Sequence, residues 1–291
     1  MRQAVASGVG RGRLRGRDLG NPFWGIRSPP DSTLTVLGRA LAYSTRMPEA
    51  SFFSHVTAAQ LWGIPLPLRF QADHLLDVSV PTGHFVPAGK GMRGHRMAID
   101  ASDIATLDGL RVTSPARTWC DLASVLCDED LVAAGDYLLW RRRPTSIRVS
   151  REDLEVALAR FRGKRHRPLL VASIPVLTDR ADSRPESIMR VRFARAGLPA
   201  PEVNGEIYDD SGKFVAMTDL TFRAYRVGFD YDGEVHWRDA GQWGRDLKRA
   251  PRIEDAGWAY VRGGAPDLAN SSDLIDIIAS RLRARGWAGP D

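Results

Sequence analysis

The chain has 291 residues, 43% of them hydrophobic and 26% charged, with a formal net charge of +6. These values are ordinary for a globular protein with room for two domains. No run of about 18 or more apolar residues is present, which argues against a membrane-spanning segment. The basic N-terminus lacks the apolar stretch of a signal peptide, so we expect a cytoplasmic protein. We also expect that it binds no organic cofactor.

The positive charge is concentrated in two segments. Residues 1–30 contain six Arg and one Asp, and residues 141–167 contain ten Arg or Lys and three acids. The net charges of +5 and +7 leave about −6 for the rest of the chain. This distribution suits a nucleic-acid partner bound through its phosphates, and it equally suits a solvated tail and a solvated linker.

The first half of the chain predicts an α+β domain. The glycine- and arginine-rich residues 1–30 predict a basic flexible arm. Apolar spacing and capping residues then predict helices at 34–43, 54–62, 115–126, 129–143 and 150–161, with strands at 74–81, 95–100 and 110–115. We place an α+β domain at 31–145, followed by a helix and basic linker at 146–175. Cys120 and Cys127 are expected to be reduced thiols.

The remaining residues, 176–291, predict a second domain of the α/β class. A helix at 184–198 precedes strands at 202–210, 213–222 and 225–233, which short turns connect into an antiparallel meander. A helix through 241–257, a strand at 258–263 and a helix at 271–286 complete the pattern. A meander joined through a crossover helix to another strand predicts a mixed sheet flanked by helices.

Two acids stand where a strand is predicted. In VGFDYDGEVHW, residues 227–237, Asp230 and Asp232 point to the same face because strand side chains alternate. Asp219 lies on the preceding strand, and the turn at 223–225 can bring it near Asp230. A buried carboxylate is costly unless another group compensates its charge.

A divalent cation is the obvious compensator. A helix packed on the sheet could bring Glu186 to Asp219 and Asp230, and a ligand set of oxygens only suits Mg²⁺ or Mn²⁺. His236 could then act as a general base or hold the leaving group. Taken singly, each of these residues is also consistent with a turn, a cap or surface packing.

Four segments in this region resemble the very-short-patch-repair-endonuclease-like family, a branch of the PD-(D/E)XK nuclease superfamily. They are SRPESIMRVRFARAGLPAPEVN, VAMTDLTF, RVGFDYDGEVHW and GRDLKRAPRIEDAGWAYVR, in the family's order over residues 183–262. The resemblance implies a restriction-endonuclease-like mixed sheet and metal-dependent cleavage of DNA.

The resemblance also implies roles for individual residues. Glu186, Asp219 and Asp230 match the metal-binding acids, and Asp232 stands where the superfamily has a lysine. His236 matches the branch's histidine. Asp at position 230 departs from the family's usual Glu and has a shorter side chain. The basic residues expected to contact DNA are Arg190, Arg245, Lys248, Arg249 and Arg262.

The first half, roughly residues 20–135, resembles AbiEi-type antitoxins of abortive-infection systems. The matching segments are SHVTAAQLWGIPLP and LRVTSPARTWCDLA. Members often begin with a DNA-binding winged helix, of which residues 1–30 resemble only the tail, so operator binding is not implied. We expect packing and capping roles for His55, Trp62 and Arg117.

Two functions therefore follow as expectations. The first is a magnesium-dependent DNA endonuclease that nicks or cleaves phosphodiester bonds, with Glu186, Asp219, Asp230, Asp232 and His236 as the catalytic set. The second is a non-catalytic DNA-binding transcriptional regulator, or the antitoxin of a type IV toxin–antitoxin system with a toxin as partner.

Overall fold

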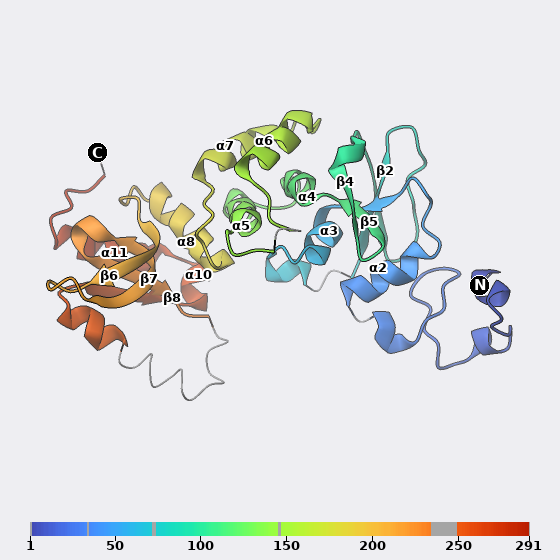
Figure 1. The fold of residues 1–291 in the computed structure, drawn as a ribbon, viewed down its shortest axis with the longest axis horizontal. Helices are drawn as coiled ribbons and strands as arrows, with labels where there is room; N and C mark the ends of the chain where they lie inside the picture. The colour runs from blue at the N-terminus through green and yellow to red at the C-terminus, as the bar shows by residue number, and fades with distance from the viewer. Residues whose placement is uncertain (1, 34, 72–73, 145–146, 234–248, 291) are drawn as a thin grey trace. The chain divides into compact units, whose positions relative to one another are not determined.

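The computed structural model describes residues 2–33, 35–71, 74–144, 147–233 and 249–290 (Figure 1). The chain divides into two compact units. Unit 1 comprises Met1–Ala134 and Arg143–Pro175, and unit 2 comprises Gly135–Arg142 and Val176–Asp291. In both, mixed sheets lie against helices, which agrees with the predicted mixed α/β class.

Unit 1 contains a five-stranded mixed sheet with the order β3-β2-β1-β5-β4 in the described residues. β1 is antiparallel to β2 and parallel to β5, while β2 and β3 are parallel. The return loop between β2 and β3 passes over Gly94, where an added Cβ would lie 2.1 Å from the Pro87 carbonyl oxygen. The strands are β1 Phe52–Phe53, β2 Leu76–Pro81, β3 Met92–Met97, β4 Ile104–Leu107 and β5 Leu110–Thr113.

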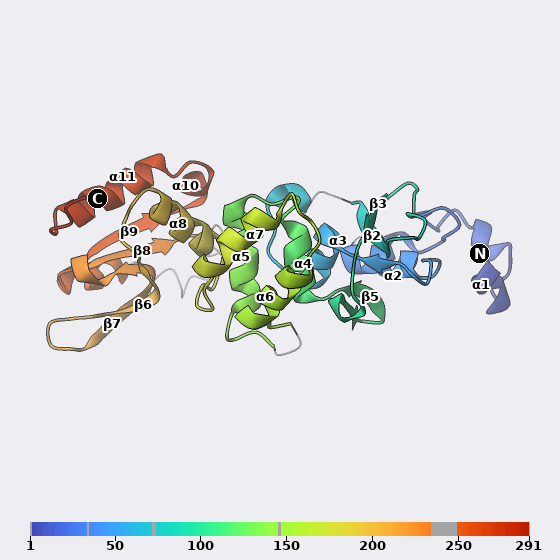
Figure 2. The ribbon, with the colours of Figure 1, turned by 90° about the horizontal axis from the view of Figure 1, so that it is seen from above.

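Helices pack with this sheet, and two of them begin with serine caps. The Ser114 and Ser150 hydroxyls accept hydrogen bonds from the backbone N–H groups of Arg117 and Asp153, respectively. Figure 2 shows α3 beside the sheet and α4 next to α3, with α6 and α7 beyond α4. The helices of unit 1 are α1 Arg2–Ala6, α2 Val36–Ser44, α3 His55–Leu61, α4 Pro115–Leu122, α6 Arg151–Arg160 and α7 Arg167–Ser173, and α5 Asp128–Leu139 runs from unit 1 into unit 2.

Residues 1–30 contribute to the packing of unit 1. Leu14, Phe23 and Ile26 are buried, and Gly20 forms an antiparallel bridge with Ser28. These apolar side chains are spaced irregularly among Gly and Arg, so they give no helix or strand period. The predicted flexibility of residues 1–30 is a separate property and stays a prediction.

Unit 2 contains a four-stranded sheet with the order β6-β7-β8-β9 in the described residues. The first three strands form the predicted antiparallel meander, and β9 is parallel to β8. The turn between β7 and β8 is the short 3-10 helix Arg223–Tyr225. The strands are β6 Glu202–Tyr208, β7 Phe214–Phe222, β8 Val227–Tyr231 and β9 Ala259–Gly263.

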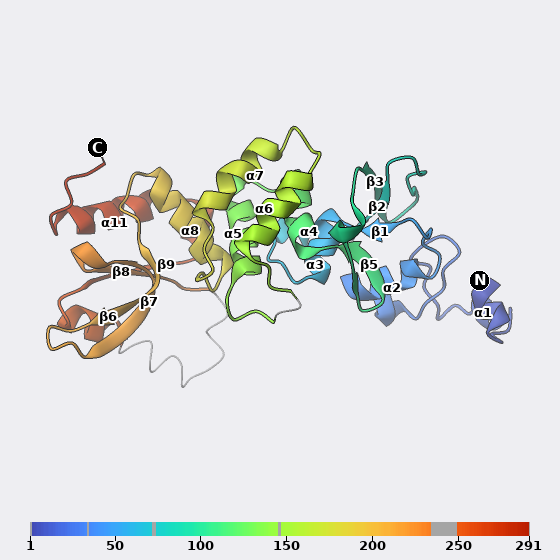
Figure 3. The ribbon, with the colours of Figure 1, turned by 45° about the horizontal axis from the view of Figure 1, so that its top comes forward.

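Two apolar clusters hold this sheet. The larger joins α8 and α11 to the central strands through Phe193, Phe229 and Ile278. The smaller joins Ile253, from the helical residues 249–255, to Ile207. Figure 3 shows α8 and α11 beside the strands. The labelled helices are α8 Arg184–Arg195, α10 Ala265–Ala269 and α11 Ser272–Arg283.

Two simpler expectations can be compared with the structure. Cys120 and Cys127 are both free thiols, as predicted. Among the described residues, no helix combines the length and the apolar character needed to cross a bilayer.

Candidate functional site

The acids predicted to meet lie where the β7–β8 ladder ends. Regular pairing runs from Phe222 opposite Val227 to Leu220 opposite Phe229. At the next position, the Asp219 N–H donates to Asp230 Oδ1 at 2.9 Å, and the Tyr231 N–H donates to Asp219 Oδ2 at 2.7 Å. Two carboxylates thus replace backbone acceptors in the ladder, which fixes both side chains beside each other.

Glu186 reaches this region from the first turn of α8. Ser183 caps the helix by accepting a hydrogen bond from the Glu186 N–H, and Pro185 occupies the first turn, where a missing N–H is tolerated. Glu186 Oε2 accepts a hydrogen bond from the Asp182 N–H at 3.0 Å. The residue is only 5% exposed, so its carboxyl group is held in a poorly solvated position.

The three carboxyl groups interact electrostatically. Burial, followed by the charges of Glu186 and Asp230, raises the pKa of Asp219 to about 8. Burial, aided by the charges of Asp182 and Asp230, raises the pKa of Glu186 to about 7. Near neutral pH the site therefore retains protons that isolated carboxylates would have lost.

Asp230 has further partners that compensate its charge. The Tyr260 hydroxyl donates to Asp230 Oδ2 at 2.6 Å, and Arg249 Nη2 lies 2.6 Å from the same oxygen. Burial still raises the pKa of Asp230 overall, although Arg249 opposes the increase. Sequence reasoning missed Tyr260, which lies on β9 opposite Gly228, two residues before Asp230.

Arg249 and Arg252 also contact the backbone of β7. Arg249 donates to the Met217 carbonyl, and Arg252 donates to the Val215 carbonyl at 3.1 Å. Met217 and Val215 precede the segment that pairs with β8. The two arginines therefore make equivalent backbone contacts, but Arg249 alone is paired with Asp230 in the described structure.

The other predicted residues have separate environments. Asp232 forms an ion pair with Arg262, and both side chains are nearly half exposed. Arg190 pairs with Asp136 at 2.8 Å and donates to the Val176 carbonyl, which gives it a structural role at a mostly buried position. The positions predicted for the general base and two DNA contacts lie outside the described residues: His236, Arg245 and Lys248.

The donor chemistry fits a hard divalent cation, but the present arrangement is incomplete. Within the described ranges, no group of three or more His, Cys, Asp or Glu side chains is placed to hold a metal ion. Glu186, Asp219 and Asp230 supply only carboxylate oxygens, which suit magnesium or manganese. Arg249 already occupies Asp230 Oδ2, so a cation at this oxygen would have to replace the arginine.

Unit 1 places two of the residues that resemble antitoxin positions in structural roles. Trp62 donates to the Thr113 carbonyl at 2.8 Å. Arg117 is 2% exposed and forms ion pairs with Asp121 and Asp103. These contacts agree with the expected packing and capping roles.

His55 belongs to a polar cluster that the sequence did not reveal. Its ring stacks on His95 with 4.1 Å between centroids, and its φ of +49° is in the left-handed region. Burial and the neighbouring His95 lower the pKa of His55 to about 3. His95 is in turn 2.8 Å from the buried carboxylate of Asp77, whose Arg93 partner lies opposite it on β3.

Comparison with known proteins finds similarity along most of the chain. Two proteins are each 27% identical over 256 residues, which cover 87% of this chain and 89% of the relative. They are the uncharacterized protein MT2308 of Mycobacterium tuberculosis strain CDC 1551 / Oshkosh and the uncharacterized protein Rv2248 of strain H37Rv. No family model matches the chain, and no solved structure matches it significantly.

Proposed function

We propose that unit 2 is a magnesium-dependent DNA endonuclease of the very-short-patch-repair-like type in the PD-(D/E)XK superfamily. The observation that carries this proposal is the pairing of Asp219 and Asp230 at the end of a ladder, with Glu186 close enough to raise the pKa of Asp219. Arg249 and Tyr260 compensate the charge of Asp230 only in part, because burial and neighbouring acids still raise the pKa of all three carboxyl groups.

Each part of the site has a proposed task. Glu186, Asp219 and Asp230 would hold Mg²⁺ or Mn²⁺, which when bound polarises a phosphoryl oxygen and activates a water. The Tyr260 hydroxyl orients Asp230 through its 2.6 Å hydrogen bond. Arg249 and Arg262 are both more than one-third exposed, so their guanidinium groups can contact a phosphate.

Substitution of Asp219 tests the proposed reaction. We expect Asp219→Asn to lower the rate of plasmid nicking with Mg²⁺ or Mn²⁺ at least about a hundredfold, because a misplaced or missing ligand costs that much. Nicking is measured by gel under single-turnover conditions. Asp210→Asn, which changes an exposed acid in the β6–β7 turn, is the matched control. Metal-dependent nicking that persists in Asp219→Asn would refute the proposal.

Arg249 provides a second test, which does not depend on activity. We expect Arg249→Ala to bind Mn²⁺ about tenfold more tightly than the unmodified chain, because Asp230 no longer has to give up a cationic partner. Arg252→Ala removes a similar contact with β7 without touching an acid. Calorimetry without DNA measures all three affinities. Equal affinities would show that the ion pair does not compete with metal.

One observation favours the alternative, a non-catalytic DNA-binding regulator or antitoxin. Both oxygens of Asp230 already have partners in Asp219, Tyr260 and Arg249. A site that keeps these contacts in the presence of metal and DNA would be a structural polar cluster. Sequence-specific binding without cleavage, or capture of a toxin encoded beside this chain, would support this function.

A further inference from the structure

Two aromatic rings of unit 1 are unusually exposed. Trp24 is 82% exposed and Phe85, in the β2–β3 loop, is 96% exposed. Rings in these positions contribute little to folding, because folding gains come from apolar area removed from water. Residues 78–99 around Phe85 include no Asp or Glu, but contain Lys90, Arg93 and Arg96.

Contacts join the two exposed regions. Phe23 precedes Trp24 in the chain, and its ring packs against Gly91. A Cβ added at Gly91 would lie 3.0 Å from the Phe23 ring. Phe23 also packs on Tyr43, with ring centroids 5.2 Å apart. Arg46 lies over Trp24, 5.1 Å from the ring centroid, and donates to the Trp24 carbonyl. Trp24, Arg46 and the end of the β2–β3 loop therefore form one region of unit 1.

The loop that carries Phe85 is anchored on β3. Pro87 lies against Gly94, where an added Cβ would clash with its carbonyl oxygen. Arg96 Nε donates to the His84 carbonyl at 3.1 Å. Phe85 thus projects from a loop that is tied to the sheet beside it, so its ring can bind a partner at a small entropic cost. We call Trp24, Arg46, Phe85, Lys90 and Arg96 the aromatic–basic surface.

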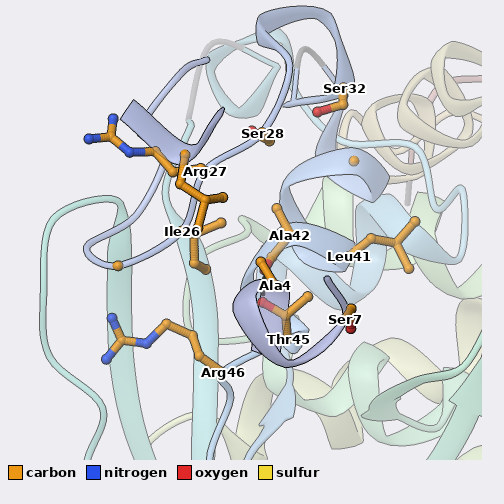
Figure 4. Close-up of a pocket in the computed structure, with 13 residues that line it drawn as sticks. Ala4, Ser7, Ile26, Arg27, Ser28, Ser32, Leu41, Ala42, Thr45 and Arg46 are labelled. Carbon is orange, nitrogen blue, oxygen red and sulfur yellow. Dashed lines mark hydrogen bonds between the residues drawn. The ribbon is translucent and has the colours of Figure 1, made fainter. Parts of the chain in front are cut away.

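A cavity lies next to Arg46. Its volume is about 460 Å³, which is within the range of small-ligand sites, and it lies between residues of the first 33 positions and α2 (Figure 4). Ile26 and Leu41 provide apolar lining, while Arg27 and Arg46 are at its margin. The Ser28 Oγ atom, also in the lining, is buried and has no hydrogen-bond partner in the described structure.

We propose that the aromatic–basic surface binds single-stranded nucleic acid. Bases stack on Trp24 and Phe85, because aromatic rings accept any base, while Arg46, Lys90 and Arg96 contact phosphates. The cavity beside Arg46 receives a base, to which Ser28 Oγ can donate or accept a hydrogen bond. The inference rests on the proposed action on DNA for its class of ligand, and it adds the strand form and the place of binding.

Fluorescence anisotropy tests the inference. It measures binding of a labelled oligothymidine of about 15 nucleotides, within the site sizes of single-strand-binding folds, to the full-length protein in metal-free buffer. We expect Trp24→Ala and Phe85→Ala each to weaken binding about tenfold with an unchanged salt dependence. Lys90→Gln and Arg96→Gln should each reduce the slope of log affinity against log salt by about 0.7. Phe214→Ala, a half-exposed ring of unit 2, is the matched control.

Rescue variants separate stacking from folding. Trp24→Phe and Phe85→Tyr keep a ring and should restore most of the affinity, and thermal unfolding reports whether each variant is folded. Affinity in both alanine variants equal to that of Phe214→Ala, or no binding of the oligonucleotide by the unmodified protein, would overturn the inference.

The outcome is also distinguishable from failure of the nuclease proposal. Oligonucleotide binding that needs Trp24 and Phe85, in a protein that shows no nicking, would support this inference and reject the nuclease. Suppose instead that nicking depends on Asp219 while oligonucleotide binding is unaffected by the Trp24 and Phe85 substitutions. That result would support the nuclease and reject this inference.

Discussion

Replacement of Arg117 by alanine is expected to lower the free energy of unfolding of unit 1 by about 3–5 kcal/mol, the usual cost of removing one partner from a buried ion pair. Arg117 Nε donates to Asp121 at 2.9 Å, and Nη1 donates to Asp103 at 3.3 Å. Both acids are almost fully buried. Burial already raises the pKa of Asp121 to about 6 with the arginine present. Urea denaturation measures the change.

Arg160→Ala is the matched control for this prediction. Arg160 also pairs with Asp103, at 3.1 Å, but its side chain is 35% exposed. Loss of a partly solvated pair should cost less than about 1 kcal/mol. A second variant, Arg117→Met combined with Asp121→Leu, removes both charges and should recover most of the stability. A loss below about 1 kcal/mol in Arg117→Ala would show that Asp121 is solvated or neutral in the fold.

Without metal, unit 2 is expected to become less stable as the pH rises from about 5 to 9. The pKa values of about 8 for Asp219 and about 7 for Glu186 lie above those of unfolded carboxyl groups. The folded state therefore binds more protons in this range, and its stabilisation by them is lost as the pH passes the folded pKa values. We expect the free energy of unfolding to fall by about 2–4 kcal/mol. Each tenfold change in proton affinity is worth about 1.4 kcal/mol, and the coupling between the acids keeps their contributions from adding in full.

Chemical denaturation at several pH values in a chelating buffer measures this effect. Asp219→Asn and Glu186→Gln should each flatten the pH dependence, since each removes one repelling charge. Asp210→Asn changes an exposed acid and should leave the pH dependence of stability unchanged. Stability of the unmodified protein that does not fall across this range would contradict the prediction, and a flat profile would show that the acids are solvated.

The meander and its paired acids could be predicted from local patterns. β7 and β8 are rich in β-branched and aromatic residues, and the turn at Arg223–Tyr225 sets which residues face each other. These two features are sufficient to bring Asp219 beside Asp230. Strands without such a pattern were missed, including β1, which has only the two residues Phe52 and Phe53.

The partners of the acids could not be predicted in the same way. Tyr260 is 30 residues from Asp230 and reaches it through the parallel pairing of β8 and β9. The pairing of Arg190 with Asp136 joins residues 54 positions apart. Sequence patterns give the charge of an arginine but not whether it faces a phosphate or a carboxylate. Contacts of this kind depend on the tertiary register, which local periodicity does not encode.

The arginine contacts with β7 have a consequence for the behaviour of the protein at high concentration. Carbonyls at a strand edge can accept a strand from another molecule, which leads to aggregation. Within the described part of unit 2, guanidinium groups of Arg249 and Arg252 cover the carbonyls of Met217 and Val215. If Arg249 leaves Asp230 during the proposed metal uptake, the Met217 carbonyl loses this contact and becomes an acceptor that a strand of another molecule could use.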